Sequence, residues 1–360
     1  MSKIGRKRVV VALGSGKGGV GKTTLSLALA QRLCTQGHTV TLVDADLGGQ
    51  NLAAALMHPA GGPLREGFLR NAMAVSRHEK SGGQLQLVSF CHTPSDASEH
   101  DGLAGRLART LRGLRSGLVI VDLGPGVAPF TLDCFLAADL GVVVTTPEPL
   151  AIRGSFLFLE ACLLRGLERE AYGRPEANKL LRFLRKRRGN DDKPLRELLG
   201  GFNKGRHCLT SVLEVLLEKL RVGIVVNCVR EEGDKRVAQT LRAMLLDLLG
   251  MHTELWGYVP FLRELRRLSR AHHGDSTWTS PLLDGCLDPL TSVVQLAARG
   301  LRRGWPSDRI TVLDNQEGPQ VVCSTRCTCW SSCELRRGGY PCRITPLGEL
   351  KTLLADLAAE

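Results

Sequence analysis

Residues 14–24 read Gly-Ser-Gly-Lys-Gly-Gly-Val-Gly-Lys-Thr-Thr and follow the apolar run Val9–Leu13. From Gly16 to Thr23 the stretch fits the pattern G-x-x-x-x-G-K-[ST] between a strand and a helix. Glycines let the backbone curl so that successive N–H groups face phosphate oxygens, and the N-terminus of the following helix adds positive potential. Lys22 would then lie on the β- and γ-phosphates, and Thr23 would give a hydroxyl to Mg²⁺. The stretch predicts a nucleoside-triphosphate site.

The same stretch also fits the dinucleotide-binding pattern G-x-G-x-x-G, at Gly14, Gly16 and Gly19. That pattern is weak by itself. It also leaves Gly21–Thr23 unexplained, because a pyrophosphate site needs neither the lysine nor the hydroxyl of this segment. We therefore favour the triphosphate interpretation.

Composition and patterning favour an α/β fold. Hydrophobic residues make up 43% of the 360 residues and aromatic residues 4%, which suits a sheet of Val, Ile and Leu under helices better than a β-sandwich. Short β-branched runs alternate with helical patterns, as in a mainly parallel, doubly wound sheet with helices on both faces. Strands are predicted at Arg8–Leu13, Thr39–Asp44, Leu85–Phe90, Leu118–Asp122, Gly141–Thr145, Gly223–Asn227 and Glu254–Tyr258. Helices are predicted at Lys22–Gln36, Leu103–Leu114, Phe130–Ala137, Ile152–Arg165, Thr210–Leu220, Lys235–Leu249 and Leu287–Arg302.

Lys17, a second lysine inside the loop, narrows the class. With its neighbours it resembles the deviant Walker A loop of the MinD/ParA family of P-loop ATPases. Three blocks resemble the same family: Arg8–Leu52, Leu118–Glu160 and Gly223–Pro260. Within the second block, Val121–Pro149 resembles the flagellar-number and chromosome-partition branch (FlhG/MinD-like). The resemblance implies ATP and Mg²⁺ as ligands, slow hydrolysis stimulated by a partner, and an ATP-dependent homodimer in which Lys17 reaches the other subunit's nucleotide. It places the nucleotide on Gly16, Lys17, Gly18, Gly19, Val20, Gly21, Lys22, Thr23 and Thr24.

Three aspartates lie at the ends of predicted strands: Asp44, Asp46 and Asp122. Because ligands bind at the carboxyl edge of such sheets, these carboxylates are expected near the phosphates. The resemblance implies that Asp46 orients the attacking water and is catalytic together with Lys17 and Lys22. It also implies that Asp44 and Asp122, with Thr23, hold the Mg²⁺ shell. Gly124 would be a switch II hinge that senses the γ-phosphate.

Two later residues match the family's base-binding segments. The resemblance implies that Asn227 contacts the adenine and that Pro260 belongs to the segment that closes over the base, although a strand-end Asn and a turn Pro explain the same residues almost as well. Two other aspartates are not assigned to the site: Asp133 is expected on the surface and Asp139 in a helix-to-strand turn.

The charge is strongly basic. A net charge of +12 and a pI of about 9.3 favour acidic partners. Residues 165–206 hold 13 Lys or Arg against 6 Asp or Glu. We interpret them as a basic helical insert within a P-loop ATPase domain at residues 1–304, and as a contact for DNA or an acidic protein. A merely solvated helix is the alternative.

Residues 305–360 form a predicted cysteine-rich tail. Cys323, Cys327, Cys329, Cys333 and Cys342 could converge on Zn²⁺, for which four thiolates suffice. The spacing lacks paired C-x-x-C motifs, so an iron–sulfur cluster or unliganded thiols remain alternatives. The terminal amphipathic helix, Leu347–Ala359, carries mostly acidic charges, which match anionic lipid poorly and argue against membrane recruitment.

The leading functional hypothesis is an ATP-gated dimerisation switch for spatial positioning: flagellar number or placement, chromosome or cargo partition, or division-site regulation. One alternative is an iron–sulfur carrier of the Mrp type, and another is a nucleotide-gated DNA- or protein-binding module. A reductase like the nitrogenase iron protein is disfavoured, because Cys134 is the only cysteine near the strand that ends at Asp122. Twelve cysteines without a secretion signal predict reduced thiols and a cytoplasmic protein.

Overall fold

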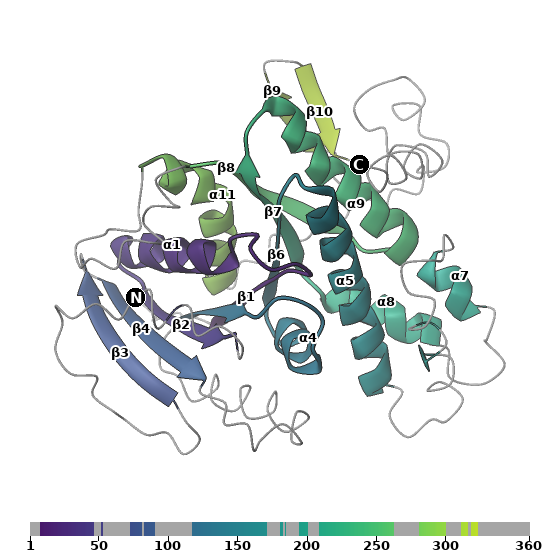
Figure 1. Ribbon diagram of the computed structural model, residues 1–360, viewed down its shortest axis with the longest axis horizontal. Helices are drawn as coiled ribbons and strands as arrows, with labels where there is room; N and C mark the ends of the chain where they lie inside the picture. The colour runs from purple at the N-terminus through teal and green to yellow at the C-terminus, as the bar shows by residue number, and fades with distance from the viewer. Residues whose placement is uncertain are drawn as a thin grey trace.

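The computed structural model describes residues 8–46, 52, 73–80, 83–90, 117–170, 181–182, 184, 194–200, 209–262, 281–299, 311–315 and 318–322. These residues form an α/β fold built on one large sheet (Figure 1). No helix within these ranges combines the length and the apolar character that a membrane crossing requires. The predicted helix Leu103–Leu114, the cysteines of the tail and its terminal helix lie outside the described residues.

The large sheet has eight strands in the order β3-β4-β2-β5-β1-β6-β7-β8. Their pairing is parallel throughout, except that the edge strand β3 runs antiparallel to β4. The strands are β1 (Val9–Gly14), β2 (Thr39–Ala45), β3 (Met73–Lys80), β4 (Gly83–Phe90), β5 (Leu118–Leu123), β6 (Leu140–Thr145), β7 (Val222–Val229) and β8 (Thr253–Pro260). A separate two-stranded antiparallel sheet consists of β9 (Thr311–Asn315) and β10 (Gly318–Val322).

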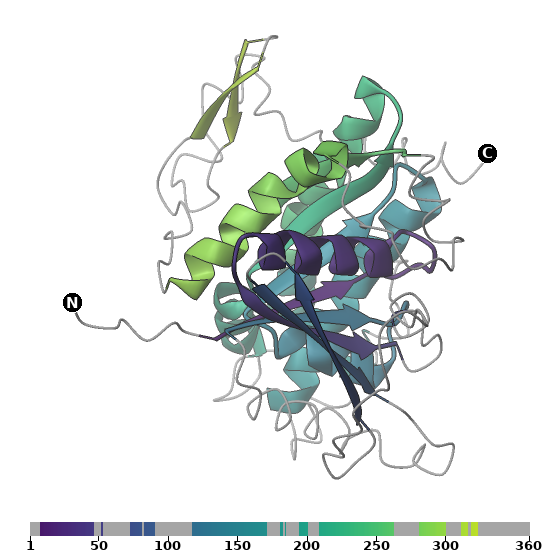
Figure 2. The ribbon, with the colours of Figure 1, turned by 90° about the vertical axis from the view of Figure 1, so that its left-hand side faces the viewer.

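The helices cover both faces of the sheet, as Figures 1 and 2 show together. One face carries α1 (Lys22–Thr35) and α11 (Pro281–Ala298). The other carries α4 (Pro129–Leu136), α5 (Pro149–Glu170), α7 (Leu195–Gly200), α8 (Leu209–Lys219) and α9 (Arg236–Leu249). The short 3-10 helix η2 (Glu232–Lys235) precedes α9.

Two apolar cores result, one on each face. In β1, Val9, Val11 and Leu13 face the core under α1 and α11, while Ala12 faces the core under α4 and α5. Side chains of a strand alternate between its two faces, and a strand buried on both sides therefore reads as a continuous apolar run. This burial explains why the central strands could be predicted from sequence.

Several element bounds differ from the prediction. Helix α5 runs from Pro149 to Glu170 instead of Ile152–Arg165, and α11 begins at Pro281 instead of Leu287. The strands β3, β9 and β10 were not predicted. The start of the predicted basic insert, from Arg165, belongs to α5, and α7 lies within it.

Candidate nucleotide site

The loop between β1 and α1 is a close-packed glycine turn. Gly19 and Gly21 have φ angles of 79° and 94°, in the left-handed region that favours glycine. A Cβ on Gly16 would lie 1.9 Å from the carbonyl oxygen of Gly154 in α5. Gly21 is also the N-cap of α1, and no side chain caps that helix end. The helix N-terminus is therefore shaped for an anion.

Lys22 is buried and directed into the loop. Its Nζ donates a hydrogen bond of 3.0 Å to the hydroxyl of Ser15, which in turn donates to the carbonyl oxygen of Lys17 at 2.7 Å. Burial lowers the pKa of Lys22, while the carboxylates of Asp122 and Asp46 act in the opposite direction. A buried ammonium group needs negative partners, and a phosphate group at the loop would supply them.

Two of the predicted carboxylates meet on adjacent strands. Asp44 of β2 and Asp122 of β5 are partners in the parallel register, and both are buried. Ser26 donates to Asp122 at 3.1 Å, and Thr23 also donates a side-chain hydrogen bond to it. Burial raises the pKa of Asp122 to about 6, against the opposing effects of Thr23 and Lys22. Carboxylate and hydroxyl oxygens are the ligands that Mg²⁺ prefers, and this set therefore fits the cation.

Asp46 lies against the glycine that follows β5. A Cβ on Gly124 would be 2.9 Å from Oδ1 of Asp46. The backbone N–H of Gly126 donates to the carbonyl oxygen of Ser15 at 3.0 Å. The segment after β5 therefore lies against Asp46 and is hydrogen-bonded to the phosphate loop.

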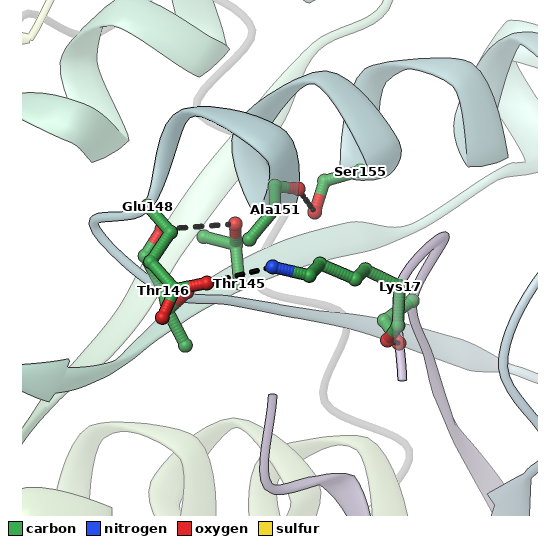
Figure 3. Close-up of polar contacts among 7 residues, drawn as sticks. Lys17, Thr145, Thr146, Glu148, Ala151 and Ser155 are labelled. Atoms are coloured by element: carbon green, nitrogen blue, oxygen red, sulfur yellow. Dashed lines mark hydrogen bonds and ion pairs between the residues drawn. The ribbon is translucent and has the colours of Figure 1, made fainter. Parts of the chain in front are cut away.

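The second loop lysine, Lys17, has a different partner from Lys22. Its Nζ forms an ion pair of 2.7 Å with Oε2 of Glu148, just before α5 (Figure 3). Both side chains are exposed, Lys17 at 38% and Glu148 at 66%. The main-chain carbonyl of Glu148 accepts bonds from the N–H groups of Ala151 and Ile152, and these bonds fix the start of α5. Lys17 therefore lies on the outer side of the loop.

The base-binding candidates are at the carboxyl ends of β7 and β8. Asn227 is buried and donates from Nδ2 to the carbonyl oxygen of Val20 at 2.8 Å. Pro260 ends β8, and the next residue, Phe261, donates from its backbone N–H to Val229 at 2.8 Å. Asn227 thus contacts the phosphate loop itself, a partner that the sequence does not reveal.

Comparison with known proteins identifies the family. Residues 11–274 match the CbiA family, described as the CobQ/CobB/MinD/ParA nucleotide binding domain. The chain belongs to this family. Within the CobQ/CobB/MinD/ParA family it is 30% identical to the flagellum site-determining protein YlxH of Helicobacter pylori over 154 residues, covering 41% of this chain and 51% of YlxH. It is 24% identical to the septum site-determining protein MinD of Escherichia coli K12 over 250 residues, covering 66% of this chain and 84% of MinD.

The fold of this MinD/ParA-type chain also has solved counterparts. MinD of Pyrococcus horikoshii, complexed with Mg-ADP, superposes with a TM-score of 0.50 at 17% identity, covering 82% of this chain and 99% of that one. This likeness confirms the predicted P-loop α/β fold. The matches to YlxH and to MinD of Chlorella vulgaris span about half of those relatives, 51% and 54% of their lengths.

The structure adds four residues to the sequence-predicted site of this family member. Ser15, Ser26, Glu148 and Gly154 contact the loop or its aspartates. Ser26 had a weak sequence signal, because it lies three residues after Thr23 and so on the same face of α1. Glu148 and Gly154 had none, since only the fold brings α5 to the loop.

One aspartate was assigned wrongly. Asp133, expected on the surface, is 5% exposed in α4. Arg165 of α5 donates to both of its carboxylate oxygens, at 2.9 and 2.8 Å. Asp139 lies in the turn before β6, as expected, and accepts the N–H of Val10 at 2.9 Å.

The described cysteines offer no cluster. Within the part of the chain that the structure describes, no group of three or more His, Cys, Asp or Glu side chains is arranged to hold a metal ion. Cys134 is buried in α4, and burial raises its pKa well above the usual range, whereas metal binding needs the thiolate. The five tail cysteines lie outside the described residues.

Proposed function

We propose that this chain is an ATP-binding and ATP-hydrolysing dimerisation switch of the MinD/ParA type that positions or partitions a cellular structure. The observation that carries the proposal is the difference in burial and in hydrogen-bond partners between its two loop lysines. Lys22 is buried and bonded to Ser15 inside the loop. Lys17 is exposed on the outer side of the loop, on Glu148. One lysine can neutralise the chain's own phosphates while the other can reach a second subunit.

The chemistry follows from the positions of these groups. Lys22 and the N–H groups at the start of α1 hold the β- and γ-phosphates. Mg²⁺, when bound with the nucleotide, neutralises phosphate charge, and Thr23, Asp44 and Asp122 are the residues that would hold it. Asp46, whose Oδ1 lies close to Gly124, would orient the attacking water.

The exposed ion pair between Lys17 and Glu148 is easily broken. Such pairs typically contribute about 0.2–1 kcal/mol, because both charges remain hydrated. An anionic phosphate in a dry interface attracts a lysine more strongly than a hydrated carboxylate does. Lys17 can therefore leave Glu148 when a nucleotide-bearing partner arrives.

The positioning role rests on the relatives. YlxH is a flagellum site-determining protein and MinD a septum site-determining protein. A DNA or acidic protein partner would fit the positive net charge of +12. Arg165 contributes little to such a surface, because it is engaged by the buried Asp133.

The test is the mass of the protein in solution with Mg-ATP and with Mg-ADP, measured by light scattering after size-exclusion chromatography. The wild-type protein should dimerise with Mg-ATP and remain a monomer with Mg-ADP. Lys22→Ala should lose nucleotide binding, and Lys17→Ala should bind ATP but stay monomeric. Asp46→Ala should accumulate as an ATP-bound dimer, because hydrolysis is blocked.

A matched control is Arg32→Ala, which breaks an ion pair of similar length, 2.6 Å, between Arg32 of α1 and Asp288 of α11. Arg32 is in the last turn of α1, at the end opposite the loop. This variant should dimerise like wild type. An unchanged ATP-dependent dimer in Lys17→Ala would refute the cross-subunit role.

A further inference from the structure

We propose that Asn227 is a positioning residue of the phosphate loop: its side chain ties the base-side strand β7 to the loop and holds the loop in its anion-binding shape. This proposal rests on the proposed ATP binding and goes beyond an adenine contact. The hydrogen bond from Asn227 to the main-chain carbonyl of Val20, called the tie below, joins residues that are 207 positions apart and is buried. Asn227 donates the bond, Val20 accepts it, and Gly21 lies against the donor.

The donor and acceptor of the tie are fixed by chemistry. A main-chain carbonyl only accepts, so the group that Asn227 presents to Val20 must be the NH₂ of its amide. The contact measures 2.8 Å. A Cβ on Gly21 would lie 2.2 Å from the same nitrogen. Gly21 therefore serves the tie as well as the left-handed turn, because any larger residue would displace Asn227.

The tie controls the direction of a loop N–H. In a trans peptide the C=O and N–H groups point in opposite directions. Anchoring the carbonyl of Val20 on Asn227 therefore turns the N–H of Gly21 away from β7. Gly21 is the N-cap of α1 and no side chain caps that end. The orientation of the peptide between Val20 and Gly21 is thus set by Asn227, which lies on the distant strand β7.

The backbone next to Asn227 is shaped for this contact. Cys228 has a φ of 62°, and no other non-glycine residue in the described ranges has a positive φ. The pairing of β7 with β8 shifts register between Val226 and Val229. Non-glycine residues in the left-handed region persist only where the surroundings enforce them, often at functional sites. The strand leaves its regular ladder at the point where Asn227 reaches the loop.

The tie and an adenine contact are compatible in one side chain. Nδ2 is used by Val20, and the amide oxygen remains as an acceptor. An exocyclic amine, as adenine carries, is a donor that suits that oxygen. Occupation of the base site and the shape of the phosphate loop would then be coupled through one amide group.

The first test is amide hydrogen exchange of residues 14–24 in the nucleotide-free protein. Asn227→Asp keeps the size of the side chain but cannot donate, and its charge repels the carbonyl of Val20. Exchange in the loop should become at least tenfold faster in this variant and in Asn227→Ala. Cys228→Gly is the control: it changes the neighbouring residue, tolerates the same φ, and should leave loop exchange as in wild type. Unchanged loop exchange in both Asn227 variants would overturn the tie.

The second test separates the loop from the base. Mg-ATP and Mg-tripolyphosphate, which has no base, compete for the site against a fluorescent ATP analogue. If Asn227 holds the loop, Asn227→Asp should weaken both ligands by a similar factor of ten or more. Loss of ATP affinity alone, with tripolyphosphate unaffected, would reduce Asn227 to a base contact. If wild type bound no ATP, the proposed function would fail, whereas the exchange experiment would still decide the tie.

Discussion

At the scale of single residues, the site concentrates charge where water is excluded. Asp122 is 1% exposed, and burial raises its pKa to about 6 from an ordinary value of 3.8. The folded protein therefore holds this proton more tightly than the unfolded chain does. The contribution of Asp122 to the free energy of unfolding is most favourable below pH 4 and declines as the pH rises towards 6.

Asp122→Asn should therefore stabilise the Mg²⁺-free protein in a pH-dependent way. At pH 8 it removes a buried charge, and the expected gain in unfolding free energy is about 3 kcal/mol, since one pKa unit corresponds to roughly 1.4 kcal/mol. At pH 4 the wild-type carboxyl is already neutral, and no gain is expected. Thermal unfolding in EDTA at the two pH values measures the difference. An equal gain at both would show that packing, and not charge, is responsible.

Gly124 leaves room for the Asp46 carboxylate. A Cβ at this position would be 2.9 Å from Oδ1 of Asp46, and Gly124→Ala must therefore push that carboxylate aside. We expect ATP hydrolysis to fall about tenfold or more, which corresponds to roughly 1.4 kcal/mol of transition-state stabilisation. The affinity for ATP should change little, because Lys22 is not touched. Phosphate release and nucleotide binding are measured for Gly124→Ala and for the matched control Gly117→Ala, whose added Cβ would meet no atom within 4 Å.

At the scale of elements, the buried strands and the edge strand β8 were predictable, and the other edge strand, β3, was not. β1, β5 and β6 are apolar runs because both of their faces are covered. β3 reads Met-Ala-Val-Ser-Arg-His-Glu-Lys, and such polar residues are common on edge strands, where they prevent further pairing. Its second half therefore lacks the apolar pattern by which strands are recognised.

The candidate site also has a part that could be predicted from the sequence and a part that could not. The loop, Asp44, Asp46 and Asp122 follow local patterns that the sequence displays. The contacts Lys17–Glu148 and Asn227–Val20 join residues 131 and 207 positions apart. Such partners depend on how α5 and β7 pack beside the loop, and one sequence holds no record of this packing.

A buried ion pair connects the packed helices α4 and α5. Asp133 is held by two bonds from Arg165, and Arg169 lies 3.8 Å from it. Removing one partner of a buried pair typically costs about 3–5 kcal/mol, because the other charge is left without a counter-ion. Arg165→Leu should therefore lower the midpoint of urea unfolding strongly. Arg169→Leu, at a more exposed and more distant side chain, should have little effect.

The packing of α4 on α5 should also affect the segment Gly124–Ala128 that we propose as a switch, since α4 follows it directly. The double variant Asp133→Leu, Arg165→Leu removes both charges of the pair, and much of the stability should return. Hydrolysis should stay impaired in this variant if the pair positions α4 as well as stabilising it. Full recovery of both properties would mean that the pair serves stability alone.

The tail carries a separate prediction. Cys323, Cys327, Cys329, Cys333 and Cys342 fall within 20 residues, and a zinc ion would supply order to a segment with few large apolar side chains. Elemental analysis of tag-free protein should find about one zinc per chain, lost when Cys327 and Cys329 become Ser. Iron in place of zinc would favour the iron–sulfur alternative. Metal-free protein with five freely reactive thiols would contradict both.

At the scale of the whole molecule, two exposed apolar side chains lie near the loop. Among the residues whose side chains the structure describes, three large hydrophobic ones are exposed: Val127 at 41%, Leu150 at 67% and Val215 at 46%. Val127 follows Gly126, which donates to the loop at Ser15. Leu150 lies two residues after Glu148, the partner of Lys17. Exposed apolar groups around a charged centre are typical of an association surface, and here they adjoin the lysine proposed to cross it.

Leu150→Glu should therefore prevent ATP-dependent dimerisation while leaving ATP binding intact. In a symmetric dimer each subunit contributes the same patch, so one substitution places two carboxylates in the interface, beside the bound phosphates. Val215→Glu is the matched control, since it charges an exposed apolar residue of α8, which packs on α5 at Gly166, whereas the loop contacts α5 at Gly154. Sedimentation with Mg-ATP should show a monomer for Leu150→Glu and a dimer for Val215→Glu. Dimerisation of both variants at wild-type ATP concentrations would mean that the subunits meet through another face, and that Lys17 cannot reach across as proposed.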